Sequence, residues 1–199
     1  MPVKPFAEAK TRLGPWQDIP REALARGLYL DTLSVALAMG EVSRVLVVTA
    51  DAEAQDMAVS MGALVVGDDP RQGINAAILR GAARACQIEP DAPVAAITAD
   101  LPALRAVELS QVLAAARAYP RAFLADHTGC GTTLLAARYG HLLRPAFEGS
   151  SRRNHALSGA QEIAHPEVRT VRLDVDTQGD LQNAQELGLG IYTSRLLTR

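Results

Sequence analysis

The chain has 199 residues, of which 48% are hydrophobic and 21% are charged. This balance is typical of a globular protein with a sizeable core, and it excludes a disordered chain or one embedded in a membrane. The formal net charge of -2 provides no strongly basic surface for nucleic acid, so we expect small-molecule ligands.

The chain opens on a basic segment, whereas an α/β sheet normally opens with a strand. Lys4, Lys10 and Arg12 fall on one predicted loop, which Pro5 and Gly14 punctuate. Three cations on one loop could hold a triphosphate, although a solvated surface loop would carry the same charges. Either the first strand is very short, or further residues of the protein precede it.

Short apolar runs alternate with longer helical patterns along the rest of the chain. Runs rich in Val, Ile and Ala predict strands over residues 45–49, 63–66, 94–98, 122–125 and 170–173. Apolar spacings of three and four predict helices over residues 20–39, 52–61, 74–86, 106–119 and 177–187. This order predicts an α/β fold with a mostly parallel, mixed central sheet and helices on both faces, in a single domain over residues 1–199.

The first predicted helix carries a signal at each end. Asp18 lies just ahead of Pro20, as expected of an N-cap region followed by a proline in the first turn. Gly40 follows the last periodic residue, where a left-handed residue commonly closes a helix. We therefore expect Asp18 to cap this helix and Gly40 to end it.

Acidic motifs follow two of the predicted strands. Asp100 comes after residues 94–98, and Asp174 and Asp176 come after residues 170–173. Ligands of open α/β sheets collect at the carboxyl ends of strands, and aspartates two residues apart project to one face of an extended chain. Clustered carboxylates of this kind suit Mg²⁺. The alternative is that Asp100 and Asp176 cap the helices that follow them.

Polar segments with glycine supply further candidate binding sites. Gly73 and Asn75 open a predicted helix, whose free amides attract anions, and Asn75 could contact a base or a ribose. Residues 126–158 break the alternation of strands and helices. Within them, the glycine and threonine cluster at 128–133 could surround a phosphate or form a plain tight turn. Residues 149–155 combine hydroxyls, cations and a helix start, and we expect His155 to form local hydrogen bonds rather than to bind a metal.

Other classes of protein lack their motifs in this chain. No GxxxxGK[ST] loop, GxGxxG fingerprint, HExxH helix or GxSxG elbow is present, which argues against P-loop phosphoryl transfer, dinucleotide redox chemistry, zinc proteolysis and elbow-type hydrolysis. Cys86 and Cys130 show neither CxxC spacing nor the dense pattern of a secreted scaffold, and no signal peptide or long apolar span is evident. We therefore expect a cytoplasmic protein that has no membrane partner.

Taken in order, these motifs resemble those of the 2-phospho-L-lactate or phosphoenolpyruvate guanylyltransferases, which make the activated precursor of coenzyme F420. That family has a MobA-like fold, a Rossmann-like nucleotide-diphospho-sugar transferase fold. The resemblance covers essentially the whole chain. It rests on PVKP at residues 2–5, AKTRL at 9–13, GINAA at 73–77, ADLPAL at 99–104, GTT at 131–133, Ser151 with His155, and DVDT at 174–177.

The resemblance implies a role for each segment. The residues implied to serve the nucleotide are Lys4, Lys10, Arg12, Gly73 and Asn75. The residues implied to hold Mg²⁺ are Asp100 with Asp174 or Asp176, and those implied to bind the small acid are Thr133, Glu148 and Ser151. Asp100 and Lys10 are the expected catalytic residues. The chain departs from the family pattern at Glu148, where glycine is usual, and in lacking most of the first strand.

The implied reaction joins GMP from GTP to the phosphate of a small acid and releases pyrophosphate. The sequence leaves open 2-phospho-L-lactate, phosphoenolpyruvate and 3-phosphoglycerate, because all three carry a phosphate and a carboxylate. The alternatives are another MobA-like nucleotidyltransferase, of cytidylyl or molybdopterin type, and a catalytically idle nucleotide-binding subunit. A homodimer is common among such folds, and the product would pass to a downstream transferase of the same pathway.

Overall fold

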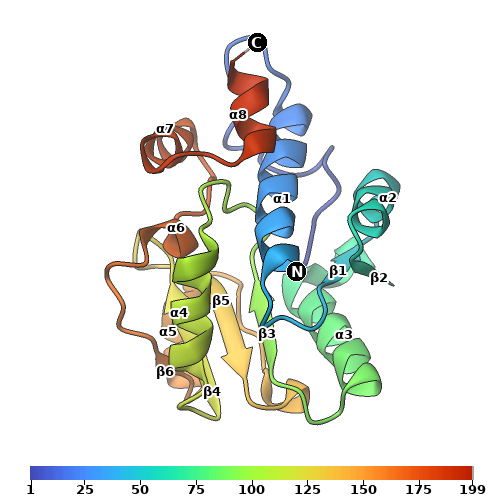
Figure 1. Ribbon diagram of the computed structural model, residues 1–199, viewed down its shortest axis with the longest axis vertical. Coiled ribbons are helices and arrows are strands. Elements are labelled where there is room, and N and C mark those ends of the chain that lie inside the picture. Colours follow the sequence, from blue (N-terminus) through green and yellow to red (C-terminus); the bar gives the residue numbers. More distant parts are fainter. Residues whose placement is uncertain (199) are drawn as a thin grey trace.

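A computed structural model of the chain describes residues 1–198. Strands in the centre of the molecule lie between helices (Figure 1). The strands are β1 (Leu46–Thr49), β2 (Leu64–Gly67), β3 (Val94–Ile97), β4 (Arg121–Ala125), β5 (Thr132–Ala137) and β6 (Gln161–Glu162). The helices are α1 (Arg21–Ala38), α2 (Ala52–Ser60), α3 (Gly73–Ile88), α4 (Ala106–Ala116), α5 (Ser151–Leu157), α6 (Arg169–Arg172), α7 (Gln178–Leu187) and α8 (Ile191–Leu197), with 3₁₀ turns at Pro70–Gln72 and Gly140–Leu142.

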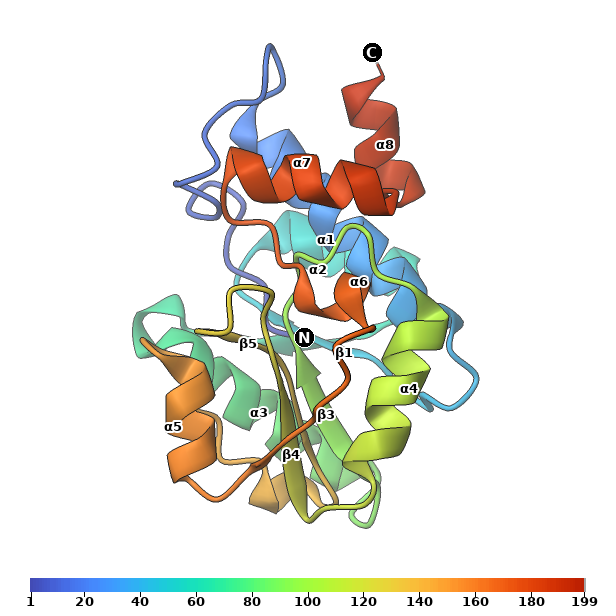
Figure 2. The same ribbon diagram turned by 90° about the vertical axis from the view of Figure 1, so that its left-hand side faces the viewer.

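The strands form two hydrogen-bonded sheets. β1 pairs in parallel with β2, and the second sheet has the order β3-β5-β4-β6. In the second sheet β5 runs antiparallel to β3 and β4, whereas β4 and β6 are parallel. Figure 2 shows α4 on one side of these strands and α3 and α5 on the other. The predicted α/β class, with mixed strand directions and helices on both faces, is confirmed. The sheet is not mostly parallel as predicted, because two of the four strand pairings are antiparallel and the strands divide into two hydrogen-bonded sheets.

The predicted helices over residues 20–39, 52–61, 74–86, 106–119 and 177–187 correspond to α1, α2, α3, α4 and α7, each within three residues at either end. The first four predicted strands correspond to β1 to β4. The first strand of the fold is reduced to a single bridge, in which Pro2 pairs in parallel with Val48. Here the Val3 N–H donates to the Val48 carbonyl at 2.9 Å.

The strand predicted over residues 170–173 is wrong, because this segment forms α6, a helix of one turn. Val171, Leu173 and Val175 are apolar and buried at every second position, and this alternation is also typical of a strand. Contacts with α4 explain the helical turn. The Glu108 carboxylate accepts hydrogen bonds from the Thr170 N–H at 2.7 Å and from its hydroxyl at 2.8 Å, which holds the segment against α4 and away from any strand.

The residues predicted to begin and to end α1 were also wrong. Its N-cap residue is Pro20, with no side-chain hydrogen bond, so Asp18 does not cap the helix. The helix closes at Met39, which is extended, and Gly40 is not among the residues with positive φ. Packing places this helix instead, since Leu24 and Leu28 on its inner face are fully buried.

A small core under the basic segment positions the polar residues described below. It joins Leu13 of the opening loop, Leu28 of α1, Val175 of the acidic segment and Leu181 of α7, all at most 1% exposed. Because Leu13 and Val175 are buried side by side in this cluster, the charged residues next to them in the sequence are brought to one region.

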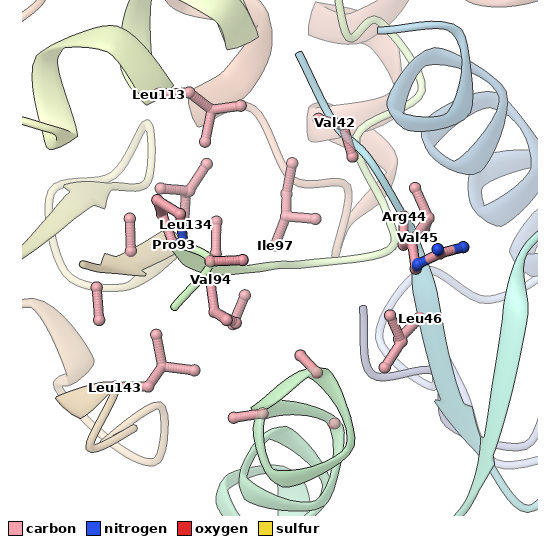
Figure 3. Close-up of a pocket in the computed structure, with 18 of the residues that line it drawn as sticks. Val42, Arg44, Val45, Leu46, Pro93, Val94, Ile97, Leu113, Leu134 and Leu143 are labelled. Atoms are coloured by element: carbon pink, nitrogen blue, oxygen red, sulfur yellow. The ribbon is translucent and has the colours of Figure 1, made fainter. Parts of the chain in front are cut away.

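An apolar cavity of about 510 Å³ separates the two sheets (Figure 3). Val45 and Leu46 lie on the β1 side of it, and Val94 and Ile97 lie on the β3 side, with Leu113 of α4 above them. None of the candidate site residues lines this cavity, so we place the chemistry elsewhere. Within residues 1–198, no helix combines the length and the apolar character needed to cross a membrane.

Candidate active site

Lys10 joins the acidic motifs that the sequence placed at the sheet edge. Its ammonium group donates to the carboxylate of Asp100, and also to that of Asp176 at 2.8 Å. The backbone supports the same arrangement, because the Val175 N–H donates to the Asp100 carbonyl at 3.1 Å. The predicted convergence of Asp100 with the Asp174 to Asp176 segment is confirmed.

Charge complementarity holds this cluster together. Burial alone would lower the pKa of Lys10, but the ion pairs with Asp100 and Asp176 outweigh it and leave that pKa raised. Burial likewise opposes ionisation of Asp176, yet Lys10, and then Arg12 and Lys4, hold its pKa below the usual value. Lys10 is therefore protonated and Asp176 ionised near neutral pH. The field of all three cations of the opening segment reaches the acidic cluster.

Asp174 has the least favourable environment of the three aspartates. Burial, and then the charges of Asp100, Asp176 and Asp126, raise its pKa to about 8. Its Oδ1 atom is buried and accepts no hydrogen bond. A buried carboxylate that lacks a donor and faces other carboxylates is stabilised by a bound cation.

The carboxylates fit a hard divalent cation. Asp100 Oδ1 and Asp174 Oδ1 are both buried without a hydrogen-bond partner, so each has an oxygen available for a metal ion. Within residues 1–198, no group of three or more His, Cys, Asp or Glu side chains is assembled tightly enough to hold a metal ion by itself. Mg²⁺ typically takes one or two carboxylates and completes its shell with water and phosphate oxygens.

The alternative role of these aspartates, as helix caps, is excluded. The N-cap residue of α7 is Thr177, which forms a capping box with Asp180, while the carboxylate of Asp176 is paired with Lys10. The helix after Asp100 begins only at Ala106, and its N-cap residue Arg105 makes no side-chain capping bond.

The basic opening segment is a tightly held loop. Lys10 adopts a positive φ of 56°, and its neighbours Lys4 and Arg12 are exposed. Arg21, at the start of α1, donates to the carbonyls of Phe6 (3.4 Å), Ala7 (2.7 Å) and Ala9. Sequence reasoning missed Arg21, because nothing local distinguishes it from a surface arginine on a helix.

Gly73 and Asn75 lie beside the segment that precedes α5. Gly73 has a φ of 78°, which favours glycine, and a Cβ there would lie 2.6 Å from Glu148 Oε1. The side-chain oxygen Oδ1 of Asn75 accepts from the Phe147 N–H at 2.8 Å. The segment predicted to bind nucleotide and the segment predicted to bind the acid are therefore adjacent.

Thr133 and Ser151 are buried, whereas Glu148 is exposed. Thr133 lies at the start of β5, where its carbonyl accepts from the Thr98 N–H at 2.9 Å and its hydroxyl has no partner. Thr98 follows β3 and lies two residues before Asp100, so the start of β5 pairs with the chain that leads into the acidic cluster. Ser151 begins α5.

His155 plays the local role expected of it. Its Nε2 atom accepts from the Ala146 N–H at 2.9 Å, and its Nδ1 atom lies 3.0 Å from the Thr132 hydroxyl. Burial, and then the nearby charge of Arg121, lower the pKa of His155 to about 4, so the ring is neutral. The ring thus supports both walls of the predicted acid site and is not a metal ligand.

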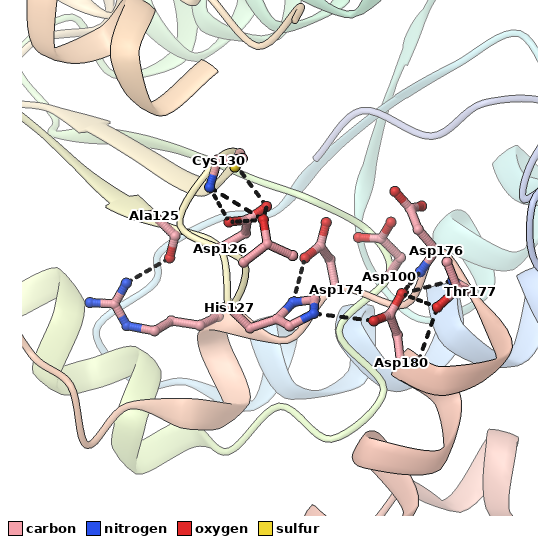
Figure 4. A network of polar contacts seen from close by, with 12 residues as sticks. Asp100, Ala125, Asp126, His127, Cys130, Asp174, Asp176, Thr177 and Asp180 are labelled. Carbon is pink, nitrogen blue, oxygen red and sulfur yellow. Dashed lines mark hydrogen bonds and ion pairs between the residues drawn. The ribbon is translucent and has the colours of Figure 1, made fainter. Parts of the chain in front are cut away.

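A second polar network was missed from the sequence (Figure 4). The oxygens of Asp126 accept from the N–H groups of Cys130 (3.0 Å) and Gly131 (2.9 Å), which shapes the glycine turn before β5. His127 lies between Asp174 and Asp180. The only local signal was an Asp-His pair directly after a buried strand, and this pattern is too common to indicate a site.

Over residues 1–198 the chain matches the protein family described as guanylyl transferase CofC like. It is 48% identical over 200 residues to the phosphoenolpyruvate guanylyltransferase of Streptomyces coelicolor, a match that covers 100% of this chain and 94% of the relative. It is also 46% identical over 199 residues to the phosphoenolpyruvate guanylyltransferase of Thermomonospora curvata, covering 100% of this chain and 87% of the relative. These matches confirm the family resemblance seen in the sequence.

Solved structures agree on the fold. A nucleotidyl transferase from Methanothermobacter superposes with a TM-score of 0.59 at 19% identity, covering 94% of this chain and 96% of that one. The CMP:2-keto-3-deoxy-manno-octonic acid synthetase complexed with CTP gives a TM-score of 0.56 at 16% identity, covering 94% and 95%. At these identities the likeness concerns architecture alone, and it confirms the predicted nucleotide-diphospho-sugar transferase fold.

Proposed function

The chain belongs to the family of CofC-like guanylyl transferases, and from that premise we propose that it transfers GMP from GTP to the phosphate of phosphoenolpyruvate in coenzyme F420 biosynthesis. An oxygen of the acceptor phosphate attacks the α-phosphorus of GTP. The bond from that phosphorus to the bridging oxygen breaks, and pyrophosphate leaves with the electron pair. The observation that carries the proposal is the ammonium of Lys10 shared by Asp100 and Asp176, beside two carboxylate oxygens that lack partners.

Mg²⁺ is part of the proposal, and Asp100 together with Asp174 or Asp176 would hold it. When bound, this ion neutralises the negative charge of the triphosphate and of the leaving pyrophosphate. The support is the chemistry of the donors, because hard carboxylate oxygens without hydrogen-bond donors are suited to a hard cation.

The basic opening segment would bind the triphosphate. Lys4 and Arg12 are exposed and close enough to influence Asp176, and Lys10 is held protonated between two carboxylates. Cations in these positions would orient the α-phosphate for attack and stabilise the charge that develops on the pyrophosphate. Gly73 and Asn75 would bind the nucleoside at the start of α3, where free amide groups are available.

The acid would bind between β5 and α5. The unpartnered Thr133 hydroxyl, the hydroxyl of Ser151 and the backbone at Glu148 would take its phosphate and carboxylate. An acceptor phosphate is largely a dianion near neutral pH, so its oxygen needs orientation and charge screening more than a general base. This explains why no histidine is needed at the reacting atoms.

Mass spectrometry of the product tests the proposal directly. The protein is incubated with Mg²⁺, one of the four NTPs and one of three acids: phosphoenolpyruvate, 2-phospho-L-lactate or 3-phosphoglycerate. We expect a GMP adduct of phosphoenolpyruvate and release of pyrophosphate. A product only with CTP would favour a cytidylyl-type enzyme on the same scaffold. GTP binding in calorimetry with no product from any acid would favour an idle nucleotide-binding subunit.

A further inference from the structure

His127 lies between Asp174, in the acidic segment, and Asp180, in the first turn of α7 (Figure 4). Its Nε2 atom is 3.1 Å from Asp180 Oδ1, and its Nδ1 atom is 3.6 Å from Asp174 Oδ1. Its backbone N–H donates to the Arg172 carbonyl at 2.8 Å. The Nε2 atom is therefore within hydrogen-bond distance of Asp180, whereas the Nδ1 atom faces Asp174 at a longer distance. The side chain of His127 is 30% exposed.

Asp180 links His127 to the backbone of the acidic segment. Its second oxygen, Oδ2, accepts from the N–H groups of Asp176 (3.1 Å) and Thr177 (2.8 Å) and from the Thr177 hydroxyl (2.8 Å). One carboxylate thus fixes the chain at Asp176 through Oδ2 and meets the histidine through Oδ1. Removal of the ring would free one side of this carboxylate.

His127 also belongs to the turn that leads into the predicted acid site. The residue before it, Asp126, organises the amides of Cys130 and Gly131, and the chain then enters β5 at Thr132. The ring therefore links the turn between β4 and β5 to the acidic segment before α7. These two segments are distant in the sequence, and each carries one half of the proposed site.

We infer that His127 is a positioning residue, which orients Asp174 and the backbone at Asp176 for a divalent cation and links their placement to the acid-binding turn. The inference rests on the proposed function, because the metal role of Asp174 belongs to it. Partners that orient metal-binding carboxylates typically change metal affinity by about 10-fold to 100-fold when they are removed.

The first measurement needs no metal and no turnover. Amide hydrogen exchange of a peptide spanning residues 174–180 is compared between the metal-free protein and its His127→Ala variant. We expect exchange at Asp176 and Thr177 to become about ten-fold faster, with thermal unfolding almost unchanged. His165→Ala is the matched control, since His165 also contacts a carboxylate, that of Glu167 at 2.6 Å, but lies outside the site.

The second measurement is the affinity of the protein for Mn²⁺ alone, from the electron paramagnetic resonance signal of free Mn²⁺. We expect His127→Ala to weaken binding about ten-fold or more, and His127→Gln to recover part of the loss because its amide can still reach Asp180. His165→Ala should bind as the wild type does. If the alanine variant is unfolded, His127→Gln is compared with the wild type and is expected to bind several-fold more weakly.

The outcomes separate this inference from the proposed function. Weakened Mn²⁺ binding with no GMP transfer by the wild type would support the positioning role and reject the reaction. GMP transfer by the wild type, with Mn²⁺ affinity within two-fold of it in both His127 variants, would reject the positioning role and leave the reaction standing. A wild-type protein that binds no Mn²⁺ would also overturn the inference.

Discussion

Asp100 combines two environments in one carboxylate. One oxygen accepts from Lys10, whereas the other is buried without a donor. We predict that Asp100→Asn reduces turnover about 10²-fold or more, because the amide keeps the volume of the side chain and loses the negative charge that a cation needs. Pyrophosphate release is the measurement, with Asp91→Asn on an exposed turn as the control. Wild-type rates in Asp100→Asn would remove Asp100 from the metal set.

His155 should make folding stability depend on pH. In the unfolded chain it titrates near 6.5, but its pKa in the folded protein is lowered to about 4 by burial and Arg121. The unfolded state therefore binds the proton first as the pH falls. The contribution is complete above pH 6.5 and is lost between pH 6.5 and 4, by roughly 3 kcal/mol in total.

Denaturant unfolding at several pH values measures this effect of His155. The difference in unfolding free energy between the wild type and His155→Gln should shrink steadily from pH 7 to pH 4. Taking this difference cancels the titration of all other groups. A difference that stays constant across this range would contradict the prediction.

At the scale of elements, the C-terminal helix α8 is held by a residue of α1. The buried carboxylate of Asp31 accepts from the N–H groups of Tyr192 and Thr193, both at 2.9 Å, in the first turn of α8. A Cβ at Gly190 would lie 2.3 Å from Asp31 Oδ1, so this approach requires glycine. The two hydrogen bonds of Asp31 join residues that are 161 and 162 positions apart in the sequence.

We predict that Asp31→Ala lowers the unfolding free energy by roughly 2 kcal/mol, because two amide groups at the start of α8 lose a charged acceptor. Chemical denaturation followed by circular dichroism measures the loss. Glu22→Ala, on the same helix, removes a side chain that is 46% exposed and only 3.9 Å from Arg26, and should change stability by less than about 0.5 kcal/mol. Equal effects of the two substitutions would mean that Asp31 does not secure α8.

At the scale of the whole molecule, the division of the strands into two sheets leaves apolar space in the interior. Ala96 of β3 is 4% exposed and lines the cavity of about 510 Å³. We predict that Ala96→Val raises the unfolding free energy by about 1 kcal/mol, because two further methyl-sized groups are buried in existing space.

Thermal and denaturant unfolding test this prediction against Ala122→Val. Ala122 is fully buried in β4 and does not line the cavity, so valine there should crowd a packed region and destabilise the protein by about 1 to 3 kcal/mol. If both substitutions destabilise the protein to the same extent, the space beside Ala96 is not available to a larger side chain.

The sequence by itself determined the helices α1 to α4 and α7, the strands β1 to β4, and the family. These features are local: apolar residues repeat with the period of a helix or strand, and the motifs around Lys10, Gly73, Asp100 and Asp174 each fall within a few neighbouring residues. The sequence also predicted that Asp100 converges with the Asp174 to Asp176 segment, but half of the reasoning was wrong, because a helical turn and not a strand precedes Asp174.

Only the tertiary structure decided which partners these residues meet. Lys10 contacts Asp100 and Asp176 across 90 and 166 positions, Glu108 holds the helical turn at Thr170 against α4, and His127 contacts Asp180 from another segment. Local periodicity reports which face of an element is apolar. It cannot report contacts between distant segments, because such contacts form and stabilise the protein only once the elements that carry them have packed together.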